Sequence, residues 1–225
     1  MDPKVKKRVK EFFTPFGSLT IKKGELIITP ETQLNKVFYL ESGFVRMFSI
    51  SITGEELSLH TFRPGSFFPL LLIIAGIKNS YYFVASTSVK LRFASTAKVI
   101  NFLKNEPDVL FDLCIRLTRG LHGNLVRLEH IVLDQSYTQL ISLLLYFANH
   151  FSQKSGNVQM IAFPLTHKEL AAWIGSSRET ISRKLDILRT KNLIKNKGKY
   201  ILISDIKLLE KELNKASATI SQNRD

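Results

Sequence analysis

The sequence predicts an α+β protein: a β-rich barrel or jelly roll at the N-terminus, a long central helix, and a C-terminal domain of short helices with a two-stranded wing. Three observations predict this order. Short β-rich runs fill residues 18–97, a proline-free stretch with heptad spacing follows at 108–134, and capped helices followed by a hairpin occupy the last third. We therefore divide the chain into residues 1–106, 107–134 and 135–225.

The composition limits the class of protein. With 225 residues, 44% of them hydrophobic and 23% charged, the chain can bury a core. Its 32 Lys and Arg against 19 Asp and Glu give a net charge of +13, which favours a polyanionic partner, either nucleic acid or an anionic membrane surface. The single cysteine, Cys114, excludes a disulfide framework and a four-thiolate metal site, and it indicates a reducing cytoplasm.

We expect no export signal and no membrane-spanning segment. The basic residues 1–10 are not followed by the apolar run of a signal peptide. The most apolar run, residues 69–77, is shorter than the about 20 residues that a membrane helix needs. We expect this run to form a buried strand or the wall of a pocket.

The N-terminal part begins with a short amphipathic helix at residues 4–13, where apolar side chains recur at helical spacing. After it, the predicted strands are residues 26–29, 37–40, 44–50, 57–62, 81–86 and 89–93. Glycines at 43, 54 and 65 punctuate these runs, and glycine supplies the positive φ that tight turns require. Many short strands at this spacing indicate a barrel or jelly roll.

The central helix has a heptad pattern. The residues at steps of three and four are Cys114, Leu117, Leu121, Asn124, Leu128 and Ile131. Such a seam is typical of a helix paired with a second copy, although an apolar stripe that packs on the β-rich part would look similar. Asn124 is polar within the seam, so we expect it to set the register or to contact a ligand.

A second apolar helix is predicted at residues 136–151, followed by a polar loop at 152–157. Thr166 and Glu169 form a capping box that opens the next helix. Gly175 suits the left-handed turn after it, and Ser177 caps a further helix that runs to about residue 191. Small Ala171 at the helix crossing and Ile181 between the helices complete a helix–turn–helix pattern; an ordinary helical hairpin is the alternative.

The start of the second helix carries groups that read DNA bases. Between residues 178 and 199 there are eight Lys or Arg and two acidic residues, the densest positive charge of the chain. Arg pairs with guanine, Glu accepts from cytosine, and Ser reaches bases or phosphates from such a helix in the major groove. The candidate base readers are Arg178, Glu179, Ser182 and Arg183. A solvated helix face would carry similar charges.

A basic wing follows, with a turn at Lys197-Gly198 between two short strands. The candidate contacts to DNA phosphates are Thr166, His167, Ser177, Thr180, Lys184, Lys195, Lys197 and Lys199. A last helix has Ile206, Leu209 and Leu213 on one face, and we expect residues 216–225 to form a frayed tail.

Residues 166–203, THKELAAWIGSSRETISRKLDILRTKNLIKNKGKYILI, resemble the DNA-binding domain of the Crp/Fnr family of bacterial transcription regulators. The segment FYLESG at 38–43 and the Arg63-Pro-Gly65 turn extend the resemblance, which covers about residues 12–213. It implies a cyclic-nucleotide-binding-type jelly roll, a dimerising central helix and operator binding as a homodimer, with contact to RNA polymerase if the protein activates transcription. It also implies that Arg178, Glu179 and Arg183 read bases; Ser182 matches a reading position of the Fnr branch.

The N-terminal half departs from the best-known members. Cyclic-nucleotide binders of the family follow the turn glycine with a Gly-Glu segment and carry an arginine for the phosphate, whereas here Gly65 is followed by Ser-Phe-Phe-Pro and an apolar run. A buried anion without a counter-charge is costly, so we do not expect cAMP. One cysteine cannot serve the oxygen-sensing chemistry. We interpret His60, His122 and His130 as ordinary histidines rather than as haem ligands.

An apolar pocket is the remaining candidate sensor. Its expected residues are Phe67, Phe68, Tyr81, Tyr82, Phe83 and Asn124. Such a pocket suits a small apolar or aromatic effector. Alternatively, these aromatic side chains fill the core and the protein binds DNA constitutively.

We expect a cytoplasmic, homodimeric DNA-binding regulator that is not an enzyme. The sequence has no glycine-rich phosphate loop, no metal-ligand spacing and no G-x-S-x-G motif, so we assign no catalytic residue, metal or cofactor. The alternatives are a haem- or cyclic-nucleotide-dependent sensor of the same family and a basic protein of membrane surfaces. A membrane-surface protein would place its Lys and Arg beside an amphipathic helix rather than on a recognition helix and wing.

Overall fold

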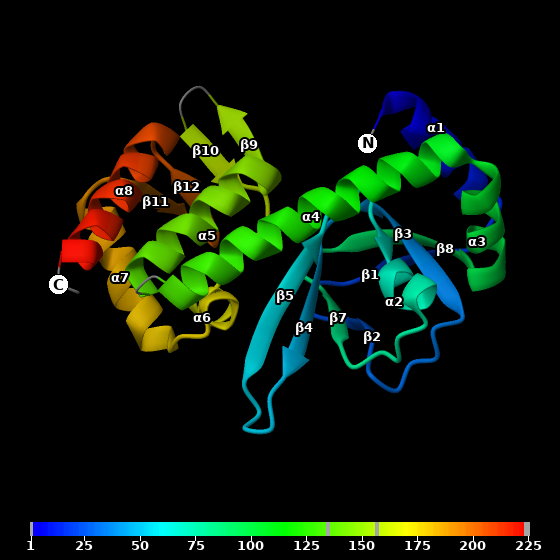
Figure 1. The fold of residues 1–225 in the computed structure, drawn as a ribbon, viewed down its shortest axis with the longest axis horizontal. Helices are drawn as coiled ribbons and strands as arrows, with labels where there is room; N and C mark the ends of the chain where they lie inside the picture. The colour runs from blue at the N-terminus through cyan, green and yellow to red at the C-terminus, as the bar shows by residue number, and fades with distance from the viewer. Residues whose placement is uncertain (1, 134–135, 156–157, 223–225) are drawn as a thin grey trace. The chain divides into compact units, whose positions relative to one another are not determined.

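A computed structural model describes the backbone of residues 2–133, 136–155 and 158–222 and the side chains of residues 2–125, 136–152 and 158–217. The chain divides into two compact units, residues 1–121 and 122–225. Helix α4 (Pro107–Leu133) contributes to both units (Figure 1). The sequence prediction treats this helix as a part of its own.

The first unit contains two antiparallel sheets. Its elements are α1 (Pro3–Phe13), β1 (Ser18–Ile21), β2 (Leu26–Ile28), β3 (Lys36–Ser42), β4 (Val45–Ile50), β5 (Glu56–Phe62), β6 (Phe67–Phe68), α2 (Leu70–Ala75), β7 (Tyr82–Ala85), β8 (Val89–Ser95), α3 (Thr96–Asn105) and the start of α4. The strand orders are β1-β8-β3-β6 and β2-β7-β4-β5. The predicted β-roll is therefore present.

The chain changes from one sheet to the other at Gly43, because β3 and β4 are consecutive but pair in different sheets. Gly43 has a φ of +84°, and a Cβ there would lie 2.4 Å from the carbonyl oxygen of Ser88. Only glycine combines that backbone conformation with so close an approach. The Phe44 N–H donates to Thr87 Oγ1 at 2.9 Å, which joins this crossing to the second one before β8.

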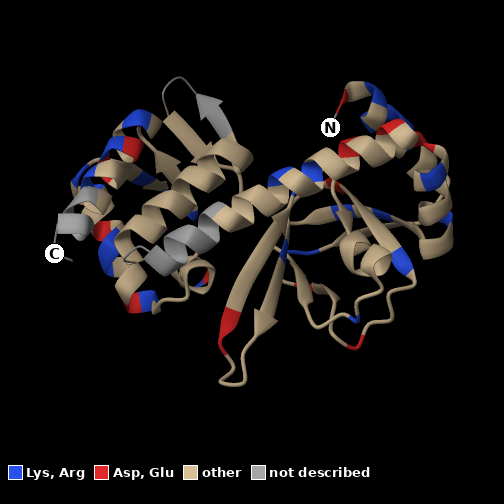
Figure 2. Ribbon diagram, in the orientation of Figure 1, with Lys and Arg blue, Asp and Glu red and all other residues tan. Residues whose placement is uncertain are grey.

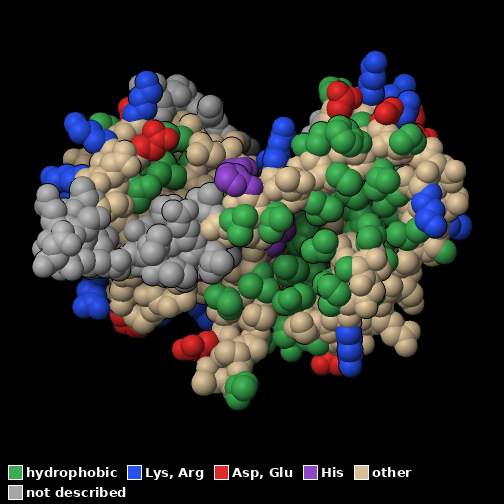
Figure 3. Space-filling model, viewed as in Figure 1, with side chains coloured by type: hydrophobic (Ala, Val, Ile, Leu, Met, Phe, Trp, Pro, Cys, Tyr) green, Lys and Arg blue, Asp and Glu red, His purple; other side chains and the backbone are tan. Residues whose placement is uncertain are grey.

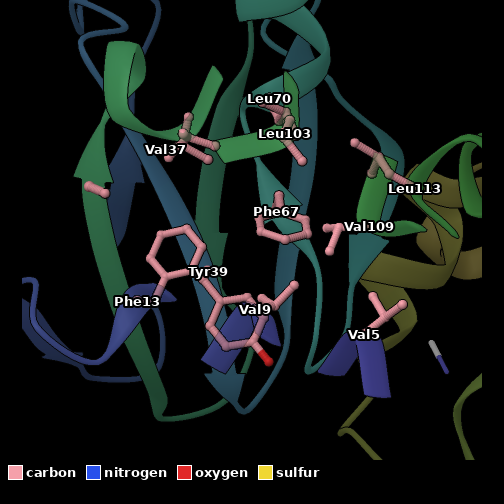
Figure 4. Packing of buried hydrophobic residues seen from close by; sticks show 12 residues of the cluster. Val5, Val9, Phe13, Val37, Tyr39, Phe67, Leu70, Leu103, Val109 and Leu113 are labelled. Carbon is pink, nitrogen blue, oxygen red and sulfur yellow. The ribbon is translucent and has the colours of Figure 1, made fainter. Parts of the chain in front are cut away.

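Alternation along β3 builds two cores. Leu40 belongs to the cluster between the sheets, whereas Val37 and Tyr39 belong to a second cluster on the other face of their sheet. Figure 4 shows this second cluster, in which Val9 and Phe13 of α1 lie against Tyr39. The first residues of α4 close it, and α4 is thereby fixed to the first unit.

The second unit is built around an apolar helix. Its elements after α4 are α5 (Ser136–Phe151), β9 (Ser152–Ser155), β10 (Val158–Ile161), α6 (His167–Ile174), α7 (Arg178–Thr190), β11 (Ile194–Lys197), β12 (Tyr200–Ile203) and α8 (Ile206–Gln222). Its sheet has the order β11-β12-β10-β9. Leu140, Ile141, Leu144 and Phe147 of α5 are completely buried, so α5 forms the centre of this core.

The predicted α+β class, with a β-roll, a long helix and a winged helix–turn–helix, is confirmed. The apolar run at 69–77 is a correction, because it forms helix α2 between Pro69 and Gly76 instead of a strand. Leu70 and Leu72 are buried, whereas Leu71 and Ile74 are exposed. A short apolar run has no periodicity that distinguishes the two structures.

Two further expectations were wrong at the boundaries. The polar loop expected at 152–157 begins with strand β9, because its backbone pairs with β10. The tail expected at 216–225 instead continues α8 to Gln222. Within the described ranges, no helix combines the length and the apolar character that crossing a membrane requires.

Candidate nucleic-acid interface

Side-chain caps fix the two helices of the helix–turn–helix. Thr166 Oγ1 accepts a hydrogen bond from the Glu169 N–H at 3.1 Å, and Glu169 Oε2 accepts one from the Thr166 N–H at 2.7 Å. Gly175 ends α6 with a φ of +73°. Ser177 Oγ accepts from the Thr180 N–H at 3.1 Å and opens α7. The predicted capping box, turn and N-cap are confirmed.

Burial decides which face of α7 is available. Ile181, Leu185 and Leu188 are buried against α6 and the rest of the unit. Arg183 lies on the opposite face and Arg178 in the first turn, and both are exposed and form no ion pair with the residues that the structure describes. Glu179 is exposed beside them and Ser182 is partly exposed. The four predicted base readers therefore all lie within the first two turns of α7 and are at least partly accessible.

The wing presents a second basic surface. β11 and β12 pair from Ile194↔Ile203 to Lys197↔Tyr200, and Gly198 turns the hairpin with a φ of +61°. The side chains from Lys195 to Lys199 are exposed. The Leu165 N–H donates to the carbonyl oxygen of Lys199 at 3.2 Å, which ties the wing to the segment before α6. Figure 2 shows Lys and Arg along α7 and this hairpin.

Behind α7, a polar cluster that the sequence reasoning missed joins three helices. The Tyr137 hydroxyl donates to Glu212 Oε1 at 2.9 Å, and Lys191 Nζ donates to the same oxygen. Burial raises the pKa of Glu212, but the hydrogen bonds from Lys191 and Tyr137 outweigh it and hold the pKa below the usual value. Burial, together with Glu212, raises the pKa of Tyr137. The cluster fixes the C-terminal end of α7 to α5 and α8.

Lys184 is predicted to contact a phosphate, yet its ammonium lies 5.8 Å from the centroid of the Tyr137 ring. The structure thus places it beside that polar cluster. Thr166, Ser177 and Thr180 are engaged in the caps, with Ser177 and Thr180 also joined through their hydroxyls at 2.9 Å. Their hydroxyls hold the backbone in place at the surface where the other predicted contacts lie.

Helix α4 packs on its own unit with a face different from the predicted seam. Val109 and Leu113 are buried, and Arg116 donates from Nε to Asp112 Oδ2 at 2.8 Å and from Nη1 to the carbonyl oxygen of Gly65 at 3.1 Å. The seam residues Leu117 and Leu121 are 43% and 60% exposed, and Asn124 is exposed. The side chains of Leu128 and Ile131 lie outside the described residues.

A broad apolar surface surrounds this part of α4 in the first unit. Its exposed members are Leu71 and Ile74 of α2, Ile77 just after it, and Leu110, Phe111, Ile115, Leu117 and Leu121 of α4. Figure 3 shows hydrophobic side chains gathered over α4 and α2. Helix α2, with the sequence LLLIIA, carries no charge. Large contiguous apolar surfaces of this kind mark interaction sites.

The predicted effector residues belong to different parts of the fold. Phe68 and Phe83 are buried and stack at 5.7 Å in the core between the sheets, where Tyr81 packs against the same cluster. Phe67 belongs to the other cluster of the first unit. Tyr82 stacks on Phe48 at 5.3 Å. Asn124 lies in the second unit.

The turn at Gly65 has a cation that the sequence reasoning missed. Arg116 of α4 lies outside the sequence motif of this turn and yet reaches the turn. Its guanidinium lies 5.7 Å from the centroid of the Phe67 ring. Its Nε donates to Asp112 and its Nη1 to the Gly65 carbonyl, whereas its buried Nη2 has no hydrogen-bond partner among the described residues. Among the side chains that the structure describes, no three of His, Cys, Asp or Glu come close enough to hold a metal ion.

Comparisons with known proteins agree with this geometry. The family profile described as a cyclic nucleotide-binding domain matches residues 18–106, and the one described as a Crp-like helix-turn-helix domain matches residues 138–212. The global nitrogen regulator of Nostoc sp. is 28% identical over 190 residues, which cover 82% of this chain and 83% of that protein. The transcriptional regulator SdrP of Thermus thermophilus is 26% identical over 197 residues, 86% of this chain and 92% of that protein.

Solved structures share the fold. A CooA mutant from Carboxydothermus hydrogenoformans superposes with a TM-score of 0.74 at 19% sequence identity and covers 90% of both chains. At that identity the likeness concerns the arrangement of the elements alone. The two matched profiles together account for the β-roll and for the helix–turn–helix with its wing.

Proposed function

The chain belongs to the Crp/Fnr family of transcription regulators, and we propose that it binds a palindromic DNA operator as a homodimer. It is a DNA-binding transcription regulator rather than an enzyme. The observation that carries the proposal is the start of α7, where four groups able to read bases lie together on an exposed and firmly capped helix. Recognition helices enter the major groove by this end.

Arg178 and Arg183 read guanines in this proposal, because a guanidinium forms two parallel hydrogen bonds with guanine O6 and N7. Glu179 accepts from a cytosine amino group, and Ser182 contacts an adjacent base. These side chains are exposed, Ser182 partly so, and neither arginine forms an ion pair within the described part of the chain, which supports these roles. The half-site sequence stays open, since both Arg178 and Ser182 are available to select it.

The wing and the start of α6 contact phosphates. Lys195, Lys197 and Lys199 are exposed on the hairpin, and His167 and Thr166 lie at the start of α6. Phosphate contacts position a protein on the duplex without reading sequence, and they make affinity fall steeply as salt rises. We include Ser177, Thr180 and Lys184 in this set.

Dimerisation occurs through α4. Leu117 and Leu121 are exposed at heptad spacing, and the neighbouring surface of α4 and α2 is apolar. A second copy of the chain can pack against such an apolar surface without bringing the positively charged groups of the two copies close together. Two parallel copies of α4 would direct two α7 helices to half-sites one DNA turn apart.

The effector in this proposal is small and apolar or aromatic rather than cAMP. Residues 66–77 contain no Lys or Arg, and the guanidinium of Arg116 beside Gly65 is already paired. The alternative is constitutive DNA binding, which the buried positions of Phe67, Phe68 and Phe83 favour. Mass spectrometry of small molecules that co-purify with the native protein distinguishes effector-dependent from constitutive DNA binding.

The central experiment is an unbiased selection of duplexes by the purified full chain, with and without cell extract. We expect a palindromic consensus and, in a parallel flotation assay, no enrichment on anionic vesicles. Absence of any preferred sequence in both selections would overturn the proposal. Binding to vesicles without duplex preference would favour the membrane-surface alternative. Matches to this consensus are expected upstream of promoters in the chromosome, because we expect a cytoplasmic protein. An activator bound there would also contact RNA polymerase.

A further inference from the structure

A hollow of about 110 Å³ lies between the helix–turn–helix and the wing. His167, the first residue of α6, lines it together with Leu165 and Leu185 on the helical side. Asn196, Lys199 and Tyr200 of the hairpin line the other side. The hollow therefore lies where the two DNA-contacting surfaces of the second unit meet, and it presents an imidazole there.

Cations surround this imidazole. Arg178 and Arg189 of α7 act on His167 electrostatically, and Lys199 lines the same hollow from the wing. The acidic groups nearby already have partners, since Asp186 pairs with Arg189 and Glu169 bonds to Thr166. Lys168 adds a further positive charge on the same helix. Burial, Arg189 and Arg178 lower the pKa of His167, and Asp186 opposes them.

We infer that His167 binds a DNA phosphate in its protonated form, so that complex formation takes up a proton at this residue. The inference rests on the proposed DNA binding and deepens it. A phosphate at the hollow adds negative charge beside the imidazole and offsets the repulsion from Arg178, Arg189 and Lys199. The imidazolium then donates a charge-assisted hydrogen bond to the phosphate, which is stronger than the hydrogen bond that a neutral imidazole donates.

The sign of the pH dependence follows. Burial and the neighbouring cations hold the pKa of His167 in the free protein below its usual value, and a bound phosphate raises that pKa. Affinity therefore rises as the pH falls from 8 towards the pKa of the free protein, and it levels off below that point. A pKa rise of one unit in the complex corresponds to an about tenfold gain in affinity. Arg and Lys contacts stay charged throughout this range and contribute no such slope.

The experiment measures the affinity of the full chain for its selected duplex at pH 6, 7 and 8 and constant ionic strength. The wild type is expected to bind several-fold more tightly at pH 6 than at pH 8. His167→Gln should bind as weakly as the wild type at pH 8 and show no slope. His167→Arg should bind tightly at every pH, which also reports that the site tolerates substitution.

A matched control is His150→Gln, which removes an exposed histidine of α5 in the same unit and should keep the wild-type slope. Calorimetry in buffers of different ionisation enthalpy should record proton uptake for the wild type and none for His167→Gln. An unchanged slope in His167→Gln, or a flat wild type, overturns this inference while leaving DNA binding intact. If the wild type binds no duplex at any pH, the proposed function fails instead.

Discussion

At the scale of single residues, exposure and pairing separate the basic side chains into different roles. Arg178 and Arg183 project from α7 without acidic partners among the described residues, whereas Arg189 is paired with Asp186 and Lys191 with Glu212. Charge counting along the sequence treats all four alike. In the folded chain, Arg178 and Arg183 remain available to a ligand, whereas Arg189 and Lys191 form ion pairs that stabilise α7.

This difference predicts two kinds of loss on substitution. Arg183→Ala should cost about 1–3 kcal/mol of binding free energy on the selected duplex and relax the base preference at one position. Lys197→Ala should weaken selected and random duplexes alike and lower the salt slope by about one. Titrations against both duplexes at several salt concentrations check this. Equal losses on both duplexes for Arg183→Ala would argue against base reading.

His60 links the β-roll to acid stability. It lies on β5 with its ring 4.6 Å from Phe62, and burial, together with Arg63, lowers its pKa to about 4. The unfolded chain binds this proton near pH 6.5 and the folded chain does not. The stability that this group contributes is therefore complete above pH 6.5 and is lost as the pH falls towards 4, by about 3 kcal/mol.

Denaturant unfolding at pH 7 and pH 4.5 tests this, with His60→Gln as the comparison. Carboxylates contribute to acid unfolding in both proteins, so the quantity of interest is the difference between them. The wild type should lose more free energy of unfolding than the variant over this range. Equal losses would show that His60 titrates alike in the folded and unfolded chains.

At the scale of elements, the caps explain why the C-terminal half is readable from sequence. Thr166, Glu169, Gly175 and Ser177 each act within a few residues of their own position, so their spacing alone sets both helix boundaries. The exposed face of α7 follows from its buried stripe in the same local way.

Ser177→Ala is therefore expected to reduce the free energy of unfolding by about 1 kcal/mol and to weaken operator binding by loosening the first turn of α7. Asp2→Ala is the matched control, because Asp2 Oδ1 caps α1 by accepting from the Lys4 N–H at 2.8 Å. Thermal unfolding and duplex titration of both variants check this. Asp2→Ala should lose a similar free energy of unfolding and keep its operator affinity. If both variants lose operator affinity equally, the loss does not arise from a local effect at α7.

The β-roll was less predictable because distant contacts decide its elements. β6 is two residues long and exists because Phe67 and Phe68 pair with β3. Helix α2 depends on Pro69 and Gly76 at its ends, and Arg116 reaches Gly65 from 51 residues away. No local pattern encodes these partners, and the same reason left the Tyr137–Glu212–Lys191 cluster unseen.

At the scale of the whole molecule, the exposed apolar surface and the proposed DNA-binding surface lie on different elements. Apolar side chains are exposed on α2 and α4 of the first unit, whereas the second unit presents the basic recognition helix and wing. This division suits a protein that associates with a copy of itself through one surface and with a polyanion through another.

The double change Leu117→Asp and Leu121→Asp is expected to convert a dimer into monomers and to lower operator affinity by at least tenfold, because each chain would then bind one half-site alone. Sedimentation and duplex titration measure the two effects. Leu26→Asp is the control, since Leu26 is 51% exposed on β2, away from α4 in the sequence. A monomeric double variant that retains full operator affinity would refute the role of α4.

The most direct measurement inserts five base pairs between the two half-sites of the selected operator and determines both the stoichiometry and the affinity of the complex. Half-sites one turn apart face the same side of the duplex, and five additional base pairs place them on opposite sides. We predict two chains on the original duplex and a loss of at least tenfold in affinity on the altered one. One chain per duplex, or an affinity that does not depend on the spacing, would contradict binding by a symmetric pair of α7 helices.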